Sequence, residues 1–185
     1  MVLNLNRNPS EIIKNRLQMD QSTATRTIRP IKKEDNAATA QVLRAVLVEM
    51  GVPKVGTAYE DKALDCLFET YSDPKAEYFI IEENGKILGG AGIAQLANYN
   101  GPIAELQKMY FTAEVRGKGY GIQMMNTCLK FAEKSGFKQV YIETMPYMEA
   151  AQKLYKKAGF YYIDGPMGNT GHHACPVHML KDLDE

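Results

Sequence analysis

Apolar residues recur along residues 27–182 with two spacings, which separate strands from helices. Alternating or β-branched apolar runs predict strands at 27–31, 77–82, 86–94, 104–111, 139–144, 160–163 and 177–180. Apolar residues at helical spacing predict helices at 35–50, 59–71, about 119–135 and 148–158. The pattern therefore predicts one α/β domain that is built on a mixed sheet.

The segments between these elements indicate how neighbouring strands are joined. Asn84-Gly85 lies between two predicted strands and predicts a tight antiparallel hairpin. The order strand, helix, strand predicts a right-handed crossover, so strands 104–111 and 139–144 are expected to be parallel.

Single residues add two local predictions. Asp35 precedes the first helical pattern, and we expect its side chain to cap that helix. Gly89, Gly90 and Gly92 lie in one predicted strand, where the missing side chains leave room for something to approach closely, or for a twisted or bulged strand.

The stretch 109–122 joins the fourth predicted strand to the third predicted helix. Its three alternating glycines are Gly117, Gly119 and Gly121. A backbone without side chains can turn sharply and direct several N–H groups at one anion. The start of the helix adds unpaired N–H groups, and Arg116 and Lys118 add positive charge. The stretch predicts a phosphate or pyrophosphate site, although an ordinary strand-to-helix turn is the alternative.

Known phosphate loops differ in the spacing of their residues. A Walker loop needs Gly-Lys followed by Ser or Thr, which this stretch lacks. In a dinucleotide fingerprint, Glu143 could be the acidic residue. The position of the third glycine, however, is occupied by Ile122 when the count starts at Gly117 and by Met124 when it starts at Gly119. The glycine spacing therefore excludes the first loop and weakens the second.

Two motifs in order carry a resemblance to a known family. Arg116, Gly119 and Gly121 match the pattern Arg-x-x-Gly-x-Gly, and Ala-x-x-Leu-Tyr-x-x-x-Gly-Phe occupies 151–160. With these motifs and its order of elements, the chain resembles the GNAT superfamily of N-acyltransferases. The resemblance implies an about seven-stranded, mostly antiparallel sheet, with strands four and five parallel and splayed and four helices around it. Met148 departs from the family, which often has Asn at that position.

The resemblance also implies acetyl-CoA as the acyl donor and cosubstrate. The pantetheine arm of the coenzyme would pair with the strand residues Met109, Tyr110 and Phe111. Its pyrophosphate would be held by the loop residues Arg116, Gly117, Lys118, Gly119, Tyr120, Gly121 and Ile122.

Three groups are expected to perform the chemistry. An ammonium with a pKa near ~10 must lose a proton before it can attack a thioester. Glu105 resembles the strand-four glutamate that some family members use as this base; a structural ion pair is the alternative. The family supplies the oxyanion donor as a strand-four N–H, here at Met109 or Tyr110. Tyr155 matches the tyrosine that faces the coenzyme sulfur and would protonate the thiolate, unless it is a core residue.

Composition and charge narrow the classes of function. Lys plus Arg and Asp plus Glu both number 22, so no net charge attracts nucleic acid or an anionic membrane. No apolar run approaches the ~20 residues that span a bilayer, and we expect a cytoplasmic protein. We expect a loose or partly helical arm at 1–25 and a single domain at 26–185. A homodimer is common in the family.

The cysteines and histidines of the chain indicate neither a disulfide framework nor a metal site. The three cysteines are odd in number and indicate a reducing compartment, with Cys66 and Cys128 expected as small core residues. Residues 171–178 hold three histidines and a cysteine, but neighbours on a strand point to opposite faces, so no metal is expected. His172 or His173 is instead an alternative base beside the acceptor.

We therefore predict an N-acetyltransferase that works by direct transfer in a ternary complex. The acceptor would be a primary amine of a small molecule, such as an amino acid, a polyamine or a xenobiotic. The alternatives are a non-catalytic acyl-CoA-binding regulatory module, an acetyltransferase for protein or peptide amines, and a dinucleotide-binding domain.

Overall fold

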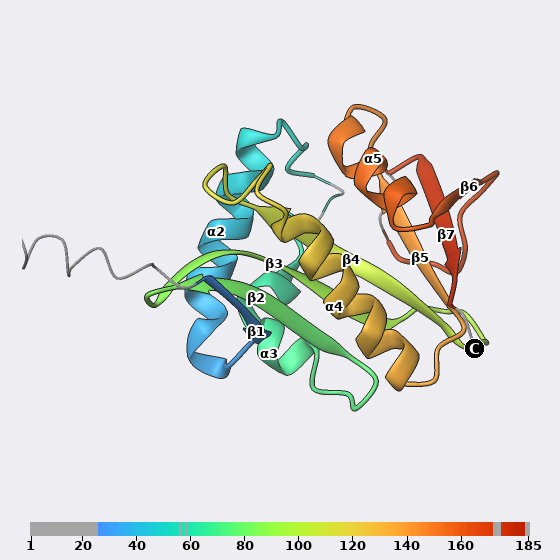
Figure 1. Cartoon of the computed structure of the whole chain (residues 1–185), viewed down its shortest axis with the longest axis horizontal. Coiled ribbons are helices and arrows are strands. Elements are labelled where there is room, and N and C mark those ends of the chain that lie inside the picture. Colours follow the sequence, from blue (N-terminus) through green and yellow to red (C-terminus); the bar gives the residue numbers. More distant parts are fainter. Residues whose placement is uncertain (1–25, 56, 58, 172–174, 184–185) are drawn as a thin grey trace, which may run out of the picture.

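The computed structural model describes residues 26–55, 57, 59–171 and 175–183. The arm predicted for 1–25, and His172 and His173, lie outside the described residues. The strands are β1 (Arg26–Pro30), β2 (Glu77–Glu83), β3 (Lys86–Gln95), β4 (Ile103–Phe111), β5 (Gln139–Thr144), β6 (Tyr161–Ile163) and β7 (Val177–Asp182) (Figure 1). The α-helices are α2 (Asn36–Glu49), α3 (Leu67–Thr70), α4 (Tyr120–Lys134) and α5 (Glu149–Lys157), and the 3₁₀ helices are η1 (Lys33–Asp35) and η2 (Lys62–Cys66).

The strands form one seven-stranded sheet in the order β1-β2-β3-β4-β5-β7-β6. Neighbouring strands pair antiparallel, except that β4 and β5 are parallel and α4 connects them. The predicted α/β fold, with a mostly antiparallel sheet and parallel fourth and fifth strands, is therefore confirmed.

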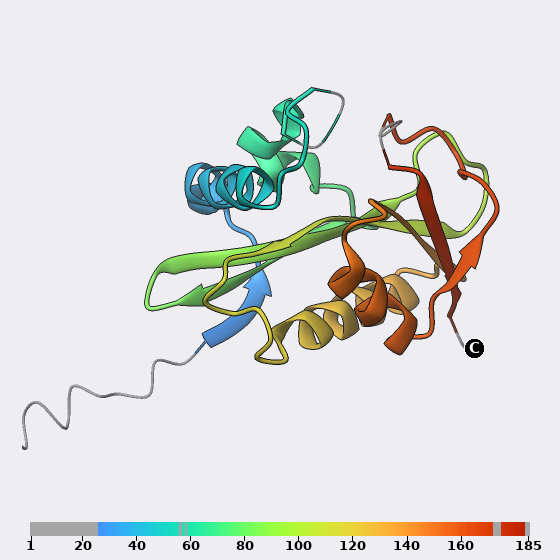
Figure 2. The ribbon, with the colours of Figure 1, turned by 90° about the horizontal axis from the view of Figure 1, so that it is seen from above.

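Helices cover both faces of this sheet, with α2 and α3 on one side and α4 and α5 on the other (Figure 2). Strand β2 serves both sides, because successive side chains of a strand point to opposite faces. Tyr78 and Ile80 belong to the core that includes α2, whereas Phe79 and Ile81 belong to the core that includes α4. All four are buried, so β2 lies between two apolar layers.

The predicted hairpin between β2 and β3 is present. Asn84 and Gly85 have φ values of 51° and 81°, both in the left-handed region. A two-residue turn of this kind matches the twist of the strands on either side, and Asn-Gly tolerates its backbone angles best.

Residues 59–71 do not form the single helix that their apolar spacing predicts. The 3₁₀ helix η2 and the short α3 occupy this segment, and Cys66, the last residue of η2, interrupts the helical backbone with a φ of −141°. Because side chains three residues apart are eclipsed in a 3₁₀ helix, Leu64 and Leu67 can both face the core, where each is 0% exposed. Cys66 is exposed, so its expected core position is wrong, whereas Cys128 is buried as predicted.

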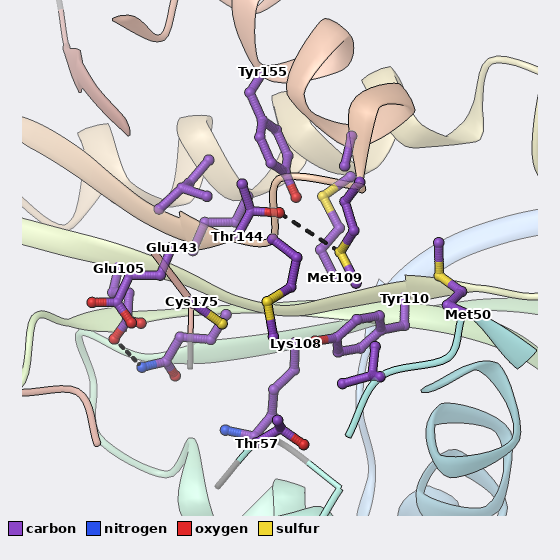
Figure 3. A pocket seen from close by; sticks show the side chains of 17 residues that line it. Met50, Thr57, Glu105, Lys108, Met109, Tyr110, Glu143, Thr144, Tyr155 and Cys175 are labelled. Carbon is purple, nitrogen blue, oxygen red and sulfur yellow. Dashed lines mark hydrogen bonds between the residues drawn. The ribbon is translucent and has the colours of Figure 1, made fainter. Parts of the chain in front are cut away.

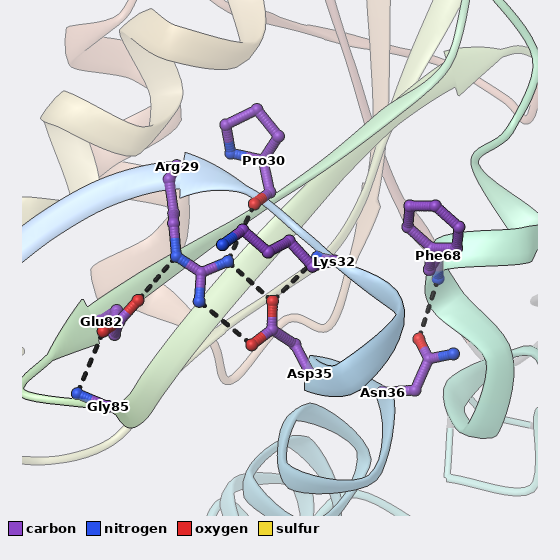
Figure 4. Close-up of polar contacts among 8 residues, drawn as sticks. All are labelled: Arg29, Pro30, Lys32, Asp35, Asn36, Phe68, Glu82 and Gly85. Atoms are coloured by element: carbon purple, nitrogen blue, oxygen red, sulfur yellow. Dashed lines mark hydrogen bonds and ion pairs between the residues drawn. The ribbon is translucent and has the colours of Figure 1, made fainter.

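The side chain of Asp35 makes no capping hydrogen bond to α2, which corrects another prediction. Its carboxylate instead accepts hydrogen bonds from the Lys32 backbone N–H at 2.8 Å and from the Arg29 guanidinium at 2.7 and 3.0 Å (Figure 4). Arg29 also donates to Glu82 at 2.6 Å, so β1 is joined to β2 and to η1. The hydrogen bonds from Arg29 hold the pKa of Asp35 below its ordinary value.

Candidate active site

Strands β4 and β5 lie side by side over their first residues and then separate. Three register pairs join them, which are Ile103–Gln139, Ala104–Val140 and Glu105–Tyr141. β4 continues to Phe111 and β5 to Thr144, so the sheet opens directly beyond Glu105. The predicted splay of the fourth and fifth strands is therefore confirmed.

Strand β4 carries a bulge beside this opening. Its pairing with β3 shifts between Gly90 and Gly92, and Lys108 on β4 adopts a left-handed φ of 51°. The Tyr78 hydroxyl donates a hydrogen bond to the Lys108 carbonyl at 3.0 Å. The Lys108 side chain is 6% exposed, and its Nζ lies 2.8 Å from Asp61 Oδ2. Two separate contacts thus hold the bulge in place.

Two buried tyrosines reach β4 through gaps in β3 that glycines leave open. A Cβ at Gly90 would meet the Tyr78 ring, and a Cβ at Gly92 would meet the Tyr71 ring and hydroxyl. Tyr71 donates a hydrogen bond to Gln107 Oε1 at 2.6 Å, on the far side of that gap. The close neighbours that these strand glycines predict are therefore tyrosines of the same chain.

Two cavities lie at the opening between β4 and β5. The first, here called the carboxylate chamber, is lined by Glu105, Glu143, Lys108, Thr57, Val52, Cys175 and side chains around them (Figure 3). The second, here called the glycine-loop chamber, is lined by residues of β4, the loop before α4, and α5. The two chambers share Met50, Met109, Tyr110, Ala151 and Tyr155.

The glycine-loop chamber brings together most of the residues predicted to bind the coenzyme. Those that line it are Met109, Tyr110, Phe111, Arg116, Gly117, Gly119, Gly121 and Ile122. Gly117 and Gly119 have φ values of 71° and 84°, which side chains disfavour, so glycine is required there by backbone shape. Arg116 and Lys157 make the lining cationic. A glycine turn, a helix start and two cations suit a pyrophosphate.

Two of the predicted loop residues do not line this chamber, and a third has another partner. Lys118 is exposed, and the ring of Tyr120 lies under the Arg26 guanidinium, 5.8 Å from its centroid. Arg116 lines the chamber, but its Nη2 lies 2.6 Å from both oxygens of Glu49 at the end of α2. The geometry thus favours the loop backbone over the Arg116 side chain as the anion-binding element.

Glu105 faces the carboxylate chamber from the last position at which β4 pairs with β5. It is 2% exposed, so it is not the exposed strand charge that a lone glutamate in a strand usually is. Gln107 Nε2 donates a hydrogen bond to Glu105 Oε2 at 2.6 Å. Burial raises the pKa of Glu105 to about 7, and the nearby Glu143 carboxylate adds to this rise. Near neutral pH this carboxyl can therefore both take up and release a proton.

Glu143 is the second carboxylate of the chamber. It lies on β5, and its carboxylate accepts hydrogen bonds from the Tyr141 hydroxyl at 2.8 Å and from Thr170 Oγ1 at 2.7 Å. The Tyr141 hydroxyl also lies 2.8 Å from His178 Nδ1. These contacts hold Glu143 in one orientation toward Glu105 (Figure 3).

Tyr155 lies between the two chambers. It projects from α5, and its side chain reaches into the carboxylate chamber (Figure 3). The residue is 6% exposed, and burial raises the pKa of its phenol to about 12. Tyr155 is thus both a core residue and a lining residue, and it keeps its proton at neutral pH.

Several residues of the site could not be found from the sequence. In the sequence, Glu143 stands out only as the acidic residue of a possible dinucleotide fingerprint, and no motif marks Lys108, Gln107 or Tyr71. Their roles depend on a bulge and on contacts across more than 30 residues, such as Tyr71 to Gln107, for which a single sequence gives no signal.

Among the described residues, no three or more His, Cys, Asp or Glu side chains are grouped as they would be to bind a metal ion. His178 contacts Tyr141 instead. Within the same described residues, none of the helices has the length and apolar character needed to cross a membrane.

Comparison with known proteins places this site in a family. The model of the Acetyltransferase (GNAT) family matches residues 44–160. The uncharacterized N-acetyltransferase YjgM of Escherichia coli is 40% identical over 157 residues, which cover 84% of this chain and 94% of that protein.

Solved structures share the fold. A GNAT-family acetyltransferase of Staphylococcus aureus has a TM-score of 0.76 at 16% identity, covering 86% of this chain and all 100% of the other. YncA of Salmonella typhimurium, a putative acetyltransferase solved with its cofactor acetyl-CoA, has a TM-score of 0.70 at 20% identity, covering 87% and 95%. The family model and the Escherichia coli relative agree with the fold and with the motifs, and the chain belongs to the acetyltransferase (GNAT) family.

Proposed function

We propose that this protein transfers an acetyl group from acetyl-CoA directly to the primary amine of a small molecule. The observation that carries the proposal is the pair of chambers that meet at Tyr155. One is lined by a glycine turn and cations that suit a pyrophosphate, and the other contains a buried carboxyl with a pKa of about 7. Two substrates can thus meet at one point without a covalent enzyme intermediate.

Acetyl-CoA supplies the activated acyl group as a thioester. The backbone of the glycine loop and the charge of Lys157 would hold its pyrophosphate, and 109–111 on β4 would lie along its pantetheine arm. The structure solved with acetyl-CoA, YncA, has the same fold, which supports this choice of donor.

Glu105 is proposed as the base. The acceptor arrives as an ammonium and must lose a proton before its nitrogen can attack. A carboxylate with a pKa of about 7 is largely ionised at slightly alkaline pH and is still basic enough to accept that proton. The backbone N–H of Met109 or Tyr110, next to the bulge at Lys108, is proposed as the donor to the developing oxyanion.

Tyr155 is proposed as the acid that protonates the departing thiolate. A pKa of about 12 would seem too high for this transfer, since a thiol in water has a pKa near ~8.5. The chamber shifts thiols as well, because burial raises the pKa of Cys175, on the same lining, to about 11. Burial thus raises the pKa of a phenol and of a thiol alike on this lining, which keeps donor and acceptor matched closely enough for the transfer.

The test is an assay of CoA thiol release from acetyl-CoA with a panel of amines, which spans amino acids, polyamines, arylalkylamines and peptides. The proposal expects turnover that depends on the amine and an acetylated amine as product. Coenzyme binding without release for any amine would indicate a regulatory module. Activity confined to peptides would move the acceptor to the protein class.

A further inference from the structure

The charged side chains on the described lining of the carboxylate chamber are two carboxylates and one lysine. Glu105 and Glu143 both line it, and the nearness of Glu143 contributes to the raised pKa of Glu105. These two carboxylates come from neighbouring strands and sit where β4 and β5 begin to separate. An acceptor that enters the chamber meets negative charge at this inner end.

Lys108 is the cationic side chain on the described lining of this chamber, and it forms an ion pair within the protein. Its Nζ lies 2.8 Å from Asp61 Oδ2, and its side chain is 6% exposed. Asp61 is itself held in place, since its carboxylate accepts a hydrogen bond from the Ala63 N–H at 2.8 Å. The Lys108 charge is thus balanced from within the protein.

We infer that the acceptor is a primary amine that carries no carboxylate on the carbon next to its amino group. The inference rests on the proposed function. When the reacting nitrogen lies near Glu105, a carboxylate one carbon away is forced close to both glutamates. It would be repelled there, and Lys108 with its Asp61 partner offers it no unbalanced cation. α-Amino acids are therefore poor acceptors, and alkylamines or arylalkylamines are good ones.

The rest of the lining suits an apolar substituent. Met50, Met145 and Met148 border the chamber together with Val52 and Ala151. Methionine side chains are flexible and polarisable, so they adapt to apolar groups of different shape. The chamber thus combines an acidic inner end for the amine with an apolar wall for the carbon skeleton.

A matched set of three acceptors isolates the effect of the carboxylate. L-Phenylalanine, L-phenylalaninamide and phenethylamine share one ring and one reacting position. The amide replaces the carboxylate by a neutral group of the same shape, and phenethylamine lacks the group altogether. Their amines also differ in basicity, with the amide the least basic and phenethylamine the most. We expect kcat/KM for both carboxylate-free amines to exceed that for phenylalanine at least ~10-fold.

Each other order of reactivity overturns the inference. If phenylalanine equals or exceeds the other two, carboxylates are tolerated. If kcat/KM falls in the order phenylalaninamide, phenylalanine, phenethylamine, the basicity of the amine governs the rate and charge repulsion does not. If turnover in the wider panel is confined to amines with an adjacent carboxylate, the inference is wrong but the proposed function stands. Absence of turnover with every amine refutes the proposed function, and the inference falls with it.

A pair of variants tests the origin of the selectivity. Glu143→Gln removes one of the two carboxylates and should reduce the preference for phenylalaninamide over phenylalanine at least ~3-fold, mainly by improving KM for phenylalanine. Glu133→Gln makes the same change at an exposed position of α4 and should leave the preference unchanged. Equal preference in the wild type and in Glu143→Gln would show that Glu143 does not select the acceptor.

Discussion

At the scale of single residues, Tyr155 offers the most direct test of the chemistry. We expect Tyr155→Phe to lower kcat by ~10²-fold, because the ring keeps its packing while the proton donor is lost. The dissociation constant for CoA should change little. Steady-state kinetics and calorimetric binding separate these two effects.

Tyr161→Phe is the matched control, since Tyr161 is exposed and its hydroxyl bonds to Asp182 at 3.2 Å, which is not on the lining of either chamber. That variant should keep wild-type kinetics. An unchanged kcat in Tyr155→Phe would remove Tyr155 from the mechanism.

The proposed role of Glu105 as the base predicts how kcat/KM depends on pH. The proposed base acts in its ionised form, so kcat/KM should rise with pH and level off above about 7, the raised pKa of this carboxyl. The same shift has a cost in stability: since the folded pKa exceeds the ordinary value, the contribution of Glu105 to stability is lost as pH rises toward about 7. Glu105→Gln should abolish the rise in kcat/KM. A profile that is identical in the variant would assign the base to another residue.

The hydrogen-bonded chain from Tyr71 through Gln107 to Glu105 should tune that profile. The bond from Gln107 lowers the pKa of Glu105, and the Tyr71 hydroxyl fixes and polarises the Gln107 amide. We expect Tyr71→Phe to move the midpoint of the kcat/KM profile to higher pH.

Tyr78→Phe is the control for this prediction, because Tyr78 is the neighbouring buried tyrosine and bonds to the Lys108 carbonyl instead. It should lower the melting temperature without moving the midpoint. Equal shifts in both variants would mean that general loosening of the site moves the profile.

The residues of the site differ in how far the sequence could reveal them. Tyr155 and the loop glycines stand in motifs of short, fixed spacing, and Glu105 lies at a fixed place on the strand before the loop. Gln107 and Lys108 have no such signal, because their roles arise only when β3 glycines admit tyrosines from other segments. Contacts between distant segments of the chain, and not the local sequence pattern, determine the roles of Gln107 and Lys108.

At the scale of elements, the anchoring of β1 can be tested through Asp35. We expect Asp35→Asn to lower the free energy of unfolding by about 2 kcal/mol at neutral pH, since it weakens charged hydrogen bonds to Arg29. The pKa of Asp35 is lowered in the fold, so this contribution is present above its ordinary pKa and is lost as pH falls through the lowered value. Urea denaturation at several pH values measures both.

Asp65→Asn is the matched control, as Asp65 also forms a double hydrogen bond, to Arg44 at 2.6 and 2.9 Å, but its side chain is 62% exposed. Because solvent screens this exposed ion pair, the free energy of unfolding of Asp65→Asn should equal that of the wild type within error. Equal losses in the two variants would contradict the importance of burial at Asp35.

Elements with a clear period were predicted well, and the exceptions have physical causes. The strands around Asn84-Gly85 are apolar runs that are buried on both faces, and the turn residues between them mark the hairpin. Residues 59–71 place apolar side chains at spacings that both a helix and a 3₁₀ turn can bury, so the pattern could not choose between them. The backbone at Cys66 decided the outcome.

At the scale of the whole molecule, the proposed donor should stabilise the fold. CoA at about 100 times its dissociation constant should add ~2.7 kcal/mol to the free energy of unfolding, because it binds the folded state alone. For a chain of 185 residues this is a rise of roughly 5–10 °C in melting temperature. Thermal scans at increasing CoA measure it, with NAD as the control ligand. An equal rise with NAD would favour the dinucleotide alternative.

The short contact between β4 and β5 has a consequence for cooperativity. Three register pairs join a four-stranded part of the sheet, β1 to β4, to a three-stranded part, β5, β7 and β6. Neighbouring strands within each part pair over longer stretches, except for the short β6. Within the sheet, the two parts are therefore joined by a short contact along the line where the substrates are proposed to meet, while one apolar core packs against both parts. We propose that a bulky coenzyme enters and leaves by local widening of the sheet along this contact, without unfolding of either part.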